Sequence, residues 1–503
     1  MRRTVSLAAI LGLVALAAGA ADKAAKAPAD SRPDFIPFDD PQVVELMRKI
    51  DSAGAYATPP MNLKKDENYA GTSEDREPFS GTKPFKENFL LQIEYAGAGR
   101  DKPEPEKLDT VKVGFIGPIQ ATVSIATGGK SHEEALGIPM LNGSRLAIEE
   151  WNARGGYLKR KIPFELVVSN DNGLWGSSGN EIVKQAYKDG VWGMLGTIDG
   201  ANSHIAIRVA LKAEVLMINS GDTDPTFIET NIPWVARVIG DDRQQAYLLT
   251  DYWYRKLNLK KVAIIRSSNR YGRFGVREIR DSARRLQRPV PIEMAYKVGQ
   301  KNFELEVERV KNANPDAVVH WGDAVEGALV LNTMREMGMT QPFFGCDRTV
   351  NEEFVKLAGK NAEGVVAAFP WNPERKDPNL ARFRKAYRER FGTEAETYAA
   401  HAYDGMNLML WAINVAGLNR AKIRDLVAYV PHPWPGVTGD IVFSACLDDV
   451  ADTYLATYEH GAWKYVSRTE LGIPKGYIAP RDRLNRAQAE VATGAPKAAT
   501  AMR

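Results

Sequence analysis

The chain has 503 residues, which allows about three domains at roughly 150 residues each. Its 66 basic and 63 acidic residues nearly balance and leave a formal net charge of +3. So small a charge on so long a chain gives no reason to expect a nucleic-acid or anionic-membrane partner. With 44% hydrophobic and 26% charged residues, the composition is that of an ordinary globular protein.

The first twenty residues have the pattern of a secretory signal peptide. Arg2 and Arg3 are followed by an apolar run at 5–17 and by the small residues Ala18 and Ala20, so residues 1–20 are predicted to be cleaved. An uncleaved anchor is the alternative, but the run is short for a span of about 20 residues. No later stretch is long and apolar enough, so we expect an exported, periplasmic chain without stable membrane insertion.

Residues 21–109 form an N-terminal extension and linker. It is polar and Pro-containing in places, with short helices expected at 41–52 and 85–95. Because it has few apolar residues for a core of its own, we expect it to pack against the main body. At the other end, residues 473–503 are rich in Ala, Arg and Lys, and this tail is predicted to be disordered.

Between these ends, short apolar runs followed by polar loops alternate with helix-like stretches. This pattern occurs twice and predicts two parallel α/β sheets covered on both faces, which bind ligands beyond the carboxyl ends of their strands. The expected helices are 142–152, 380–391 and 398–416, and a last strand is expected at 461–466. The first set of apolar runs is 111–118, 164–171, 191–200 and 215–225, and the second is 261–271, 317–323 and 342–347.

Sequence motifs for catalysis or cofactors are missing. The chain has no GxGxxG after a strand, no GxxxxGK[ST], HExxH, CxxC or GxSxG, and its six histidines are scattered. We therefore expect no catalytic residues, no cofactor and no metal. The two cysteines, Cys346 and Cys446, permit a disulfide without requiring one.

Several stretches in order resemble one known family. They are VGFIGP, GIPMLNGSRLAIEEWNARGGYLKRKIPFELVVSNDNG, VLMINSGDTDP, KKVAIIRSSNRYG, YAAHAYDGMNLMLWAI and GVTGDIVF. Together they are similar to the leucine/isoleucine/valine-binding proteins, the solute receptors of ABC importers with the type I periplasmic binding protein fold. The resemblance covers roughly 360 residues and excludes the N-terminal extension and the tail.

The resemblance implies two doubly wound lobes joined by three hinge crossings, expected near 239–242, 368–372 and 438–441. Lobe I would comprise 110–240 plus 369–439, and lobe II 241–368 plus 440–472. Such lobes can close as rigid bodies around a ligand that binds the closed state more tightly.

The first-lobe site residues follow from the same resemblance. Ala201 and Asn202 begin a helix whose N–H groups suit a ligand carboxylate, although a helix cap at Asn202 or Ser203 is an equally simple role. The next loop begins at Gly221, another candidate site residue, and Thr223 in it matches the family. Thr223 can contact the ligand or stabilise the turn. Asp222 departs from the family pattern and suggests a ligand with hydroxyl, amide or cationic groups.

In the second lobe, Tyr271 is expected to wall the cleft or to pack at a helix start. Asp347 matches the acid that binds the ligand ammonium in the family, although it is one methylene shorter. Asp323 lies near a family aromatic position. An insertion that includes 128–134 could lie across the cleft mouth or remain a surface loop.

These observations favour a solute-binding protein of a branched-chain-amino-acid-type ABC importer. It would bind an amino acid, an amide or a related small molecule and present it to an inner-membrane permease. The alternative is a ligand sensor of the same fold that acts through a protein partner, as the N-terminal extension could suggest. A third hypothesis, an enzyme with Asp222, Asp323 and Asp347 as acid–base groups, lacks supporting motifs.

Overall fold

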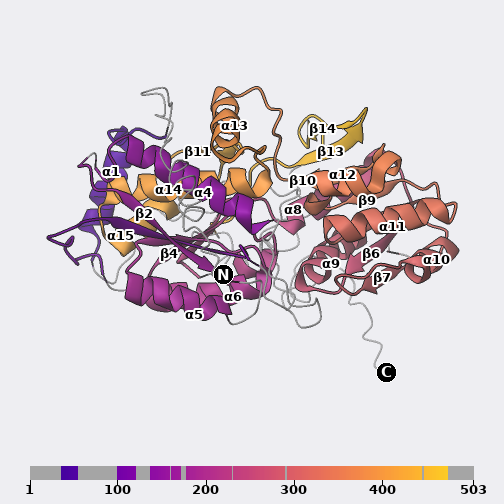
Figure 1. Ribbon diagram of the computed structural model, residues 1–503, viewed down its shortest axis with the longest axis horizontal. Coiled ribbons are helices and arrows are strands. Elements are labelled where there is room, and N and C mark those ends of the chain that lie inside the picture. The colour runs from indigo at the N-terminus through magenta and orange to yellow at the C-terminus, as the bar shows by residue number, and fades with distance from the viewer. Residues whose placement is uncertain are drawn as a thin grey trace, which may run out of the picture.

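The computed structural model describes residues 35–54, 99–120 and 136–473, apart from 159, 172–176, 229, 231, 289, 291 and 445–446. The predicted signal peptide, the helix expected at 85–95, the insertion at 128–134, Cys446 and nearly all of the predicted tail lie outside these residues. Two α/β lobes lie side by side along the longest axis of the molecule (Figure 1).

The first lobe is built on a five-stranded, fully parallel sheet with the order β2-β1-β3-β4-β5. Helices cover both of its faces, with α4 and α14 on one and α5 and α6 on the other (Figure 1), which explains why its strands are nearly continuous apolar runs. The strands are β1 (Val111–Gly117), β2 (Phe164–Asn170), β3 (Gly193–Leu195), β4 (Leu216–Asn219) and β5 (Val235–Arg237).

The helical elements of the first lobe come from both ends of the core. The long helices α4 and α14 pack against each other, and Gly143 allows a close approach because a Cβ there would lie 2.1 Å from the Ala399 carbonyl oxygen. The elements are α4 (Gly137–Ala153), α5 (Ser177–Val183), the π-helical η2 (Lys184–Asp189), α6 (Gly200–Ala213), α7 (Pro225–Ile228), α13 (Pro378–Phe391), α14 (Thr397–Ala416) and α15 (Arg420–Ala428).

The second lobe is built on a seven-stranded sheet with the order β14-β13-β10-β9-β8-β6-β7. The five strands β6 to β10 are parallel to one another, whereas β13 and β14 add an antiparallel edge. The strands are β6 (Val262–Ser267), β7 (Glu293–Tyr296), β8 (Ala317–Trp321), β9 (Phe343–Gly345), β10 (Val366–Phe369), β13 (Tyr454–Glu459) and β14 (Ala462–Ser467).

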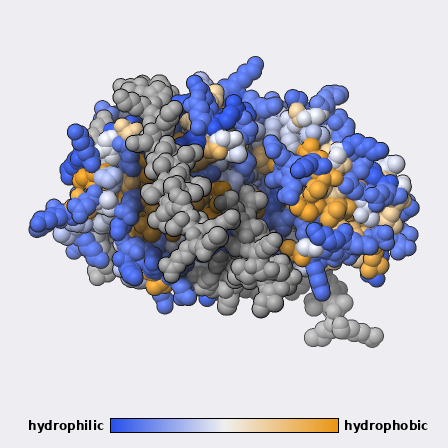
Figure 2. Space-filling model, in the orientation of Figure 1, coloured by the Kyte–Doolittle hydropathy of each residue, from blue (hydrophilic) through white to orange (hydrophobic). Residues whose placement is uncertain are grey.

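Two separate apolar clusters lie in the second lobe. One includes Trp253 and Ile264, and the other includes Phe303 and Phe343. The outward faces of the surrounding helices are largely hydrophilic, although a hydrophobic patch is visible on this lobe (Figure 2). The helical elements are α8 (Asp242–Asp251), the π-helical η3 (Tyr252–Lys256), α9 (Arg270–Arg285), α10 (Glu304–Asn312), α11 (Ala324–Glu336), the 3-10 turns η4 (Asp347–Thr349) and η5 (Gly359–Ala362), and α12 (Glu352–Ala358).

The chain passes three times between the lobes. It crosses after β5, returns after β10 to form α13 to α15, and crosses again before β13. A small ribbon of β11 (Trp434–Pro435) and β12 (Asp440–Ile441) precedes the last passage. Ile441, Phe443 and Leu447 pack in the same apolar cluster as the first-lobe helices, and this cluster extends to Ala456 of β13.

The described parts of the N-terminal extension pack on the first lobe. The expected helix at 41–52 is confirmed as α1 (Pro41–Ser52), which lies against α15 and buries Val43, Leu46 and Ile50. Just before it, Phe35 stacks on Trp151 and on Trp434, with ring centroids 5.2 Å apart in each case. These contacts agree with the expectation that the extension packs against the main body.

Further along the extension, polar contacts tie residues 99–108 to the same lobe. The Glu104 carboxylate accepts hydrogen bonds from the Tyr157 hydroxyl at 2.6 Å and from the Leu418 N–H at 2.8 Å. Arg100 forms a buried ion pair with Asp425. In addition to α1 and Phe35, residues Glu104 and Arg100 therefore join the extension to the first lobe before β1 begins.

Several predicted elements differ from the observed ones. Helix α4 begins at Gly137, five residues before the expected 142. Gly137 packs directly on the Pro118 carbonyl, where a side chain would not fit. The short strands β5 and β7 were not predicted. Both are short and contain a charged residue, Arg237 in β5 and Glu293 in β7, so neither has a continuous apolar run. Cys346 is buried with a free thiol.

Candidate ligand-binding site

The predicted site residues follow the carboxyl ends of parallel strands in both lobes, which is where open α/β sheets bind ligands. Five strand-following loops, three in the second lobe and two in the first, carry these residues. Ala201 and Asn202 follow β3, Gly221, Asp222 and Thr223 follow β4, Tyr271 follows β6, Asp323 follows β8, and Asp347 follows β9.

The start of α6 is capped by a residue that the sequence analysis did not consider. Asp199 is the N-cap, and its carboxylate accepts the Ala201 N–H at 2.7 Å, so the helix cap expected at Asn202 or Ser203 is wrong. Asn202 is fully buried, and neither atom of its side-chain amide has a hydrogen-bond partner among the described residues. Ser203 instead shares a 2.7 Å hydrogen bond with Thr197.

Asp222 shapes its own loop. Its Oδ1 accepts the Asp224 N–H at 2.9 Å, and its N–H donates to Asn219 Oδ1 at 2.8 Å. Burial and the neighbouring Asp224 raise the pKa of Asp222 to about 8. Its other oxygen, Oδ2, makes no hydrogen bond within the described parts of the chain. The loop contacts give Asp222 a structural role that does not depend on a ligand.

Thr223 lies beside an acid that the sequence analysis missed. The Asp242 N–H donates to the Thr223 carbonyl at 2.8 Å, and both side chains are buried. Burial and the nearby Asp347 carboxylate raise the pKa of Asp242, while the Thr223 hydroxyl acts in the opposite direction. Apart from this approach of the Thr223 hydroxyl, neither carboxylate oxygen of Asp242 has a hydrogen-bond partner among the described residues.

In the second lobe, Tyr271 and Asp347 are in direct contact. The Tyr271 hydroxyl donates to Asp347 Oδ1, and the Asp347 N–H donates to Gln245 Oε1 at 3.2 Å. Asp347 Oδ2 and Gln245 Nε2 have no partner in the described structure. Burial raises the pKa of Asp347, although Arg348 beside it acts in the opposite direction.

Asp323 forms an ion pair with Arg348, so its carboxylate already has a protein partner. The Arg348 Nη1 lies 2.5 Å from Asp323 Oδ1, and the guanidinium stacks 3.9 Å above the Tyr271 ring. Tyr398, in the first turn of α14, is buried close to Asp347 and Arg348. Burial and the Asp347 carboxylate hold the pKa of the Tyr398 phenol well above its usual value. Tyr398 therefore brings the first lobe next to this group.

Arg270 makes a second contact between the lobes. From the first turn of α9 it forms a 2.6 Å ion pair with Asp224 and a 2.8 Å hydrogen bond to Thr226 Oγ1. Its Nη2 lies 2.9 Å from His204 Nε2. Burial and the Arg270 charge lower the pKa of His204, so this imidazole is neutral near pH 7 and accepts the hydrogen bond.

These contacts define an interlobe cluster: Thr223, Asp242, Gln245, Tyr271, Asp347 and Tyr398. It joins the predicted Thr223, Tyr271 and Asp347 to three side chains that sequence reasoning missed. Across the described ranges, no group of three or more His, Cys, Asp or Glu side chains is arranged to hold a metal ion. The same residues include no helix with the length and hydropathy to cross a membrane.

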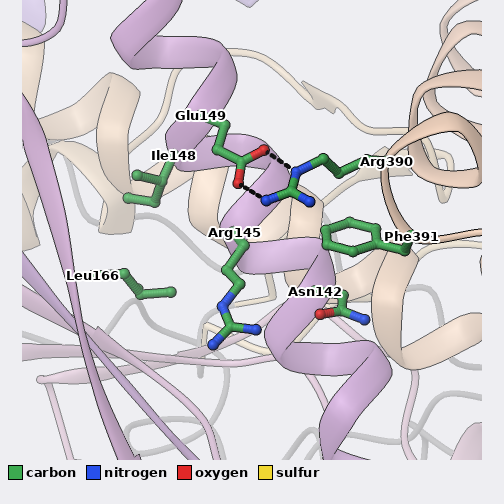
Figure 3. A pocket seen from close by; sticks show the side chains of 7 residues that line it. All are labelled: Asn142, Arg145, Ile148, Glu149, Leu166, Arg390 and Phe391. Atoms are coloured by element: carbon green, nitrogen blue, oxygen red, sulfur yellow. Dashed lines mark hydrogen bonds and ion pairs between the residues drawn. The ribbon is translucent and has the colours of Figure 1, made fainter. Parts of the chain in front are cut away.

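A separate surface groove lies between α4, α13 and β2 (Figure 3). Glu149 and Arg390 pair across it through two hydrogen bonds of 2.8 and 2.9 Å. Leu166 lies near the amino end of β2, opposite to the strand ends where such sheets bind ligands. The groove therefore fits the ligand-site geometry of the fold less well than the interlobe cluster does.

The profile of one family, described as periplasmic binding protein, matches residues 110–459. The chain belongs to this family. The matched range contains both sheets up to β13 and the whole interlobe cluster. The family comprises solute-binding proteins and is not a family of enzymes. The extension before β1 lies outside the matched residues.

Curated relatives are named for amino-acid binding. Leu/Ile/Val-binding protein homolog 2 of Brucella abortus is 28% identical over 324 residues, which are 64% of this chain and 86% of that protein. An amino acid binding protein of Pseudomonas aeruginosa is 28% identical over 306 residues, which are 59% of this chain and 79% of that one.

Solved structures share the fold. The branched-chain amino acid transporter substrate binding protein LivJ of Streptococcus pneumoniae, in complex with isoleucine, has a TM-score of 0.63 and 24% identity, covering 71% of this chain and 99% of that one. A solute binding protein from Rhodopseudomonas palustris, in complex with 3,4-dihydroxy benzoic acid, has a TM-score of 0.62 and 20% identity, covering 75% and 99%. The predicted type I periplasmic binding protein fold is confirmed.

Proposed function

We propose that this chain is the extracytoplasmic solute-binding component of a branched-chain-amino-acid-type ABC importer. It binds one small polar molecule, an amino acid, amide or related compound, between its lobes and presents it to an inner-membrane permease. The proposal includes export to the periplasm after cleavage at residue 20 and the two lobes with the boundaries expected from the sequence.

The observation that carries this proposal is a set of buried polar atoms that lack protein partners and come from both sides of the lobe interface. Asp347 Oδ2, Gln245 Nε2, both oxygens of Asp242 and the Asn202 amide are unpaired among the described residues. Burying an unpaired polar group costs free energy. A polar ligand between the lobes would supply the missing partners and favour the closed arrangement.

A thermal-shift screen of residues 21–503 against amino acids, amides, amines, aromatic acids and small alcohols tests the proposal. A ligand at about 100 times its dissociation constant adds roughly 2.7 kcal/mol of stability. We expect a hit that is lost in Asp347→Ala and retained in Glu149→Ala, which alters only the groove of Figure 3. A hit that depends on Glu149 and ignores Asp347 would contradict the interlobe site.

A further inference from the structure

Charges at the lobe interface are unequally matched. Each arginine that reaches the region is already engaged by an acid: Arg348 by Asp323, Arg270 by Asp224, and Arg237 by Asp448 and Asp241. Arg243, on the same helix as Asp242, is paired with Glu278. Among the described residues, Asp242 and Asp347 form no ion pair, although the Arg348 charge acts on Asp347 from nearby.

The two acids lie close together. Gln245 lies one turn after Asp242 on α8, and its Oε1 accepts the Asp347 N–H at 3.2 Å, so α8 places both acids at the same spot. The Asp347 carboxylate also contributes to the raised pKa of Asp242. Both acids are almost completely buried, at 0% and 2% exposure. Two carboxyl groups this close and this buried oppose each other's ionisation, and a cation between them would stabilise their charged forms.

A neutral side chain gives independent evidence of a missing ligand at this place. Gln245 is fully buried, and its Oε1 is held by the Asp347 N–H, which fixes the other end of the amide next to the acids. Its Nε2 donates to nothing in the described structure. Since no described group of acids is arranged for a metal ion, the geometry favours an organic ligand.

A ligand carboxylate, by contrast, finds few favourable partners here. The Ala201 N–H that was expected to receive it is taken by Asp199. The Thr223 hydroxyl faces Asp242, and Asp222 lies in the same loop. Asn202 offers a neutral amide, which hydrogen-bonds a carboxylate and a carboxamide alike.

Building on the proposed function, we propose that the interlobe site selects a ligand with net positive charge. The class is an amine or guanidinium that carries no carboxylate. Asp242 and Asp347 together hold its cationic nitrogen, and Gln245 Nε2 donates to a neighbouring acceptor atom of the ligand. A zwitterionic branched-chain amino acid would bring a negative charge into a region that already has an excess of it.

Matched pairs of compounds test this selectivity by isothermal titration calorimetry at pH 7 on residues 21–503. L-leucine is compared with L-leucinamide and L-phenylalanine with L-phenylalaninamide, and agmatine and 1,4-diaminobutane serve as cations of other shapes. We expect at least one cation to bind about tenfold or more tightly than the zwitterions. Asp242→Asn should weaken that binding about tenfold or more, whereas Asp316→Asn, which removes the same charge from an exposed loop, should not change it.

The outcomes separate the inference from the function on which it rests. Tighter binding of the zwitterions, or of uncharged or acidic compounds from the thermal-shift screen, would overturn the cationic class and leave the solute-binding function standing. Cation binding that is unchanged in Asp242→Asn would overturn the role of the acid pair. Failure of folded protein to bind any compound in either experiment would overturn both.

Discussion

Arg237 is the residue whose removal should test the architecture of the site most severely. It lies at the end of β5, fully buried, and its guanidinium joins three segments. It forms bonds of 2.6 and 2.8 Å to Asp448 and a 3.1 Å bond to Asp241. It also donates to the carbonyls of Asp222 and Asp224 at 3.3 and 2.7 Å, and so holds the loop that carries Thr223.

Arg237→Met keeps most of the side-chain volume but removes the charge and its five hydrogen bonds. Asp448 and Asp241 then remain buried without their counter-charge. Removing one partner of a buried ion pair costs about 3–5 kcal/mol, and we expect a loss of that size in the free energy of unfolding. It can be measured by urea titration, followed by both tryptophan fluorescence and circular dichroism because the lobes need not unfold together.

Arg390→Met is the matched control in the same lobe. Arg390 has the same two-bond geometry with Glu149, but its side chain is 53% exposed. An exposed pair contributes about 0–1 kcal/mol, so the control should lose no more than that. Adding Asp448→Leu to Arg237→Met should recover part of the loss, because it removes one uncompensated charge. Equal losses in Arg237→Met and Arg390→Met would refute the reasoning.

Three further predictions concern the extension, one helix contact and one buried acid. Ile50→Ala removes a fully buried side chain of α1 and should cost about 2–5 kcal/mol in urea unfolding; a loss under about 0.5 kcal/mol would mean that α1 does not dock on α15. Gly143→Ala should lower the free energy of unfolding, measured by urea titration, by about 1–3 kcal/mol, because its Cβ would clash with the Ala399 carbonyl. A gain in stability, as expected at an open helix position, would contradict that contact. For Asp222, whose folded pKa is raised from 3.8 to about 8, the folded state holds the proton longer than the unfolded state, so its contribution to stability falls as pH rises across that window. The advantage of Asp222→Asn over wild type should therefore grow between pH 5 and pH 8 by roughly 1.4 kcal/mol per unit at most, and a constant difference in thermal-melting scans would show that Asp222 ionises normally.

Much of the fold could be predicted because its signals are local. The run VKVGFIG of β1 is apolar except for Lys112, as expected of a strand covered on both faces, and α1 begins with Asp40 as N-cap and Pro41 in its first turn. In contrast, β5 and β7 are short strands that each contain a charged residue, Arg237 or Glu293, and so lack a continuous apolar run. Their presence depends on pairing with β4 and β6.

The site was less predictable because its members meet only in the folded chain. Asp347 and Tyr271 are 76 positions apart, and their contact can be inferred only from a resemblance. Asp242 follows Asp241, which caps α8, so the pair resembles an ordinary acidic helix start. The available signal was a second acid, directly after the helix cap, at the first expected crossing between the lobes. Asp222, in turn, stood out as a departure from the family pattern, but its carboxylate accepts an N–H of its own loop.

The most direct test of the central claim is a crystal structure of the chain with a ligand taken from the thermal-shift screen. The account predicts one ligand between the lobes, with a polar atom within hydrogen-bonding distance of the Asp347 carboxylate and another near Thr223. Ligand density in the groove of Glu149 and Arg390, with none between Thr223 and Asp347, would contradict it.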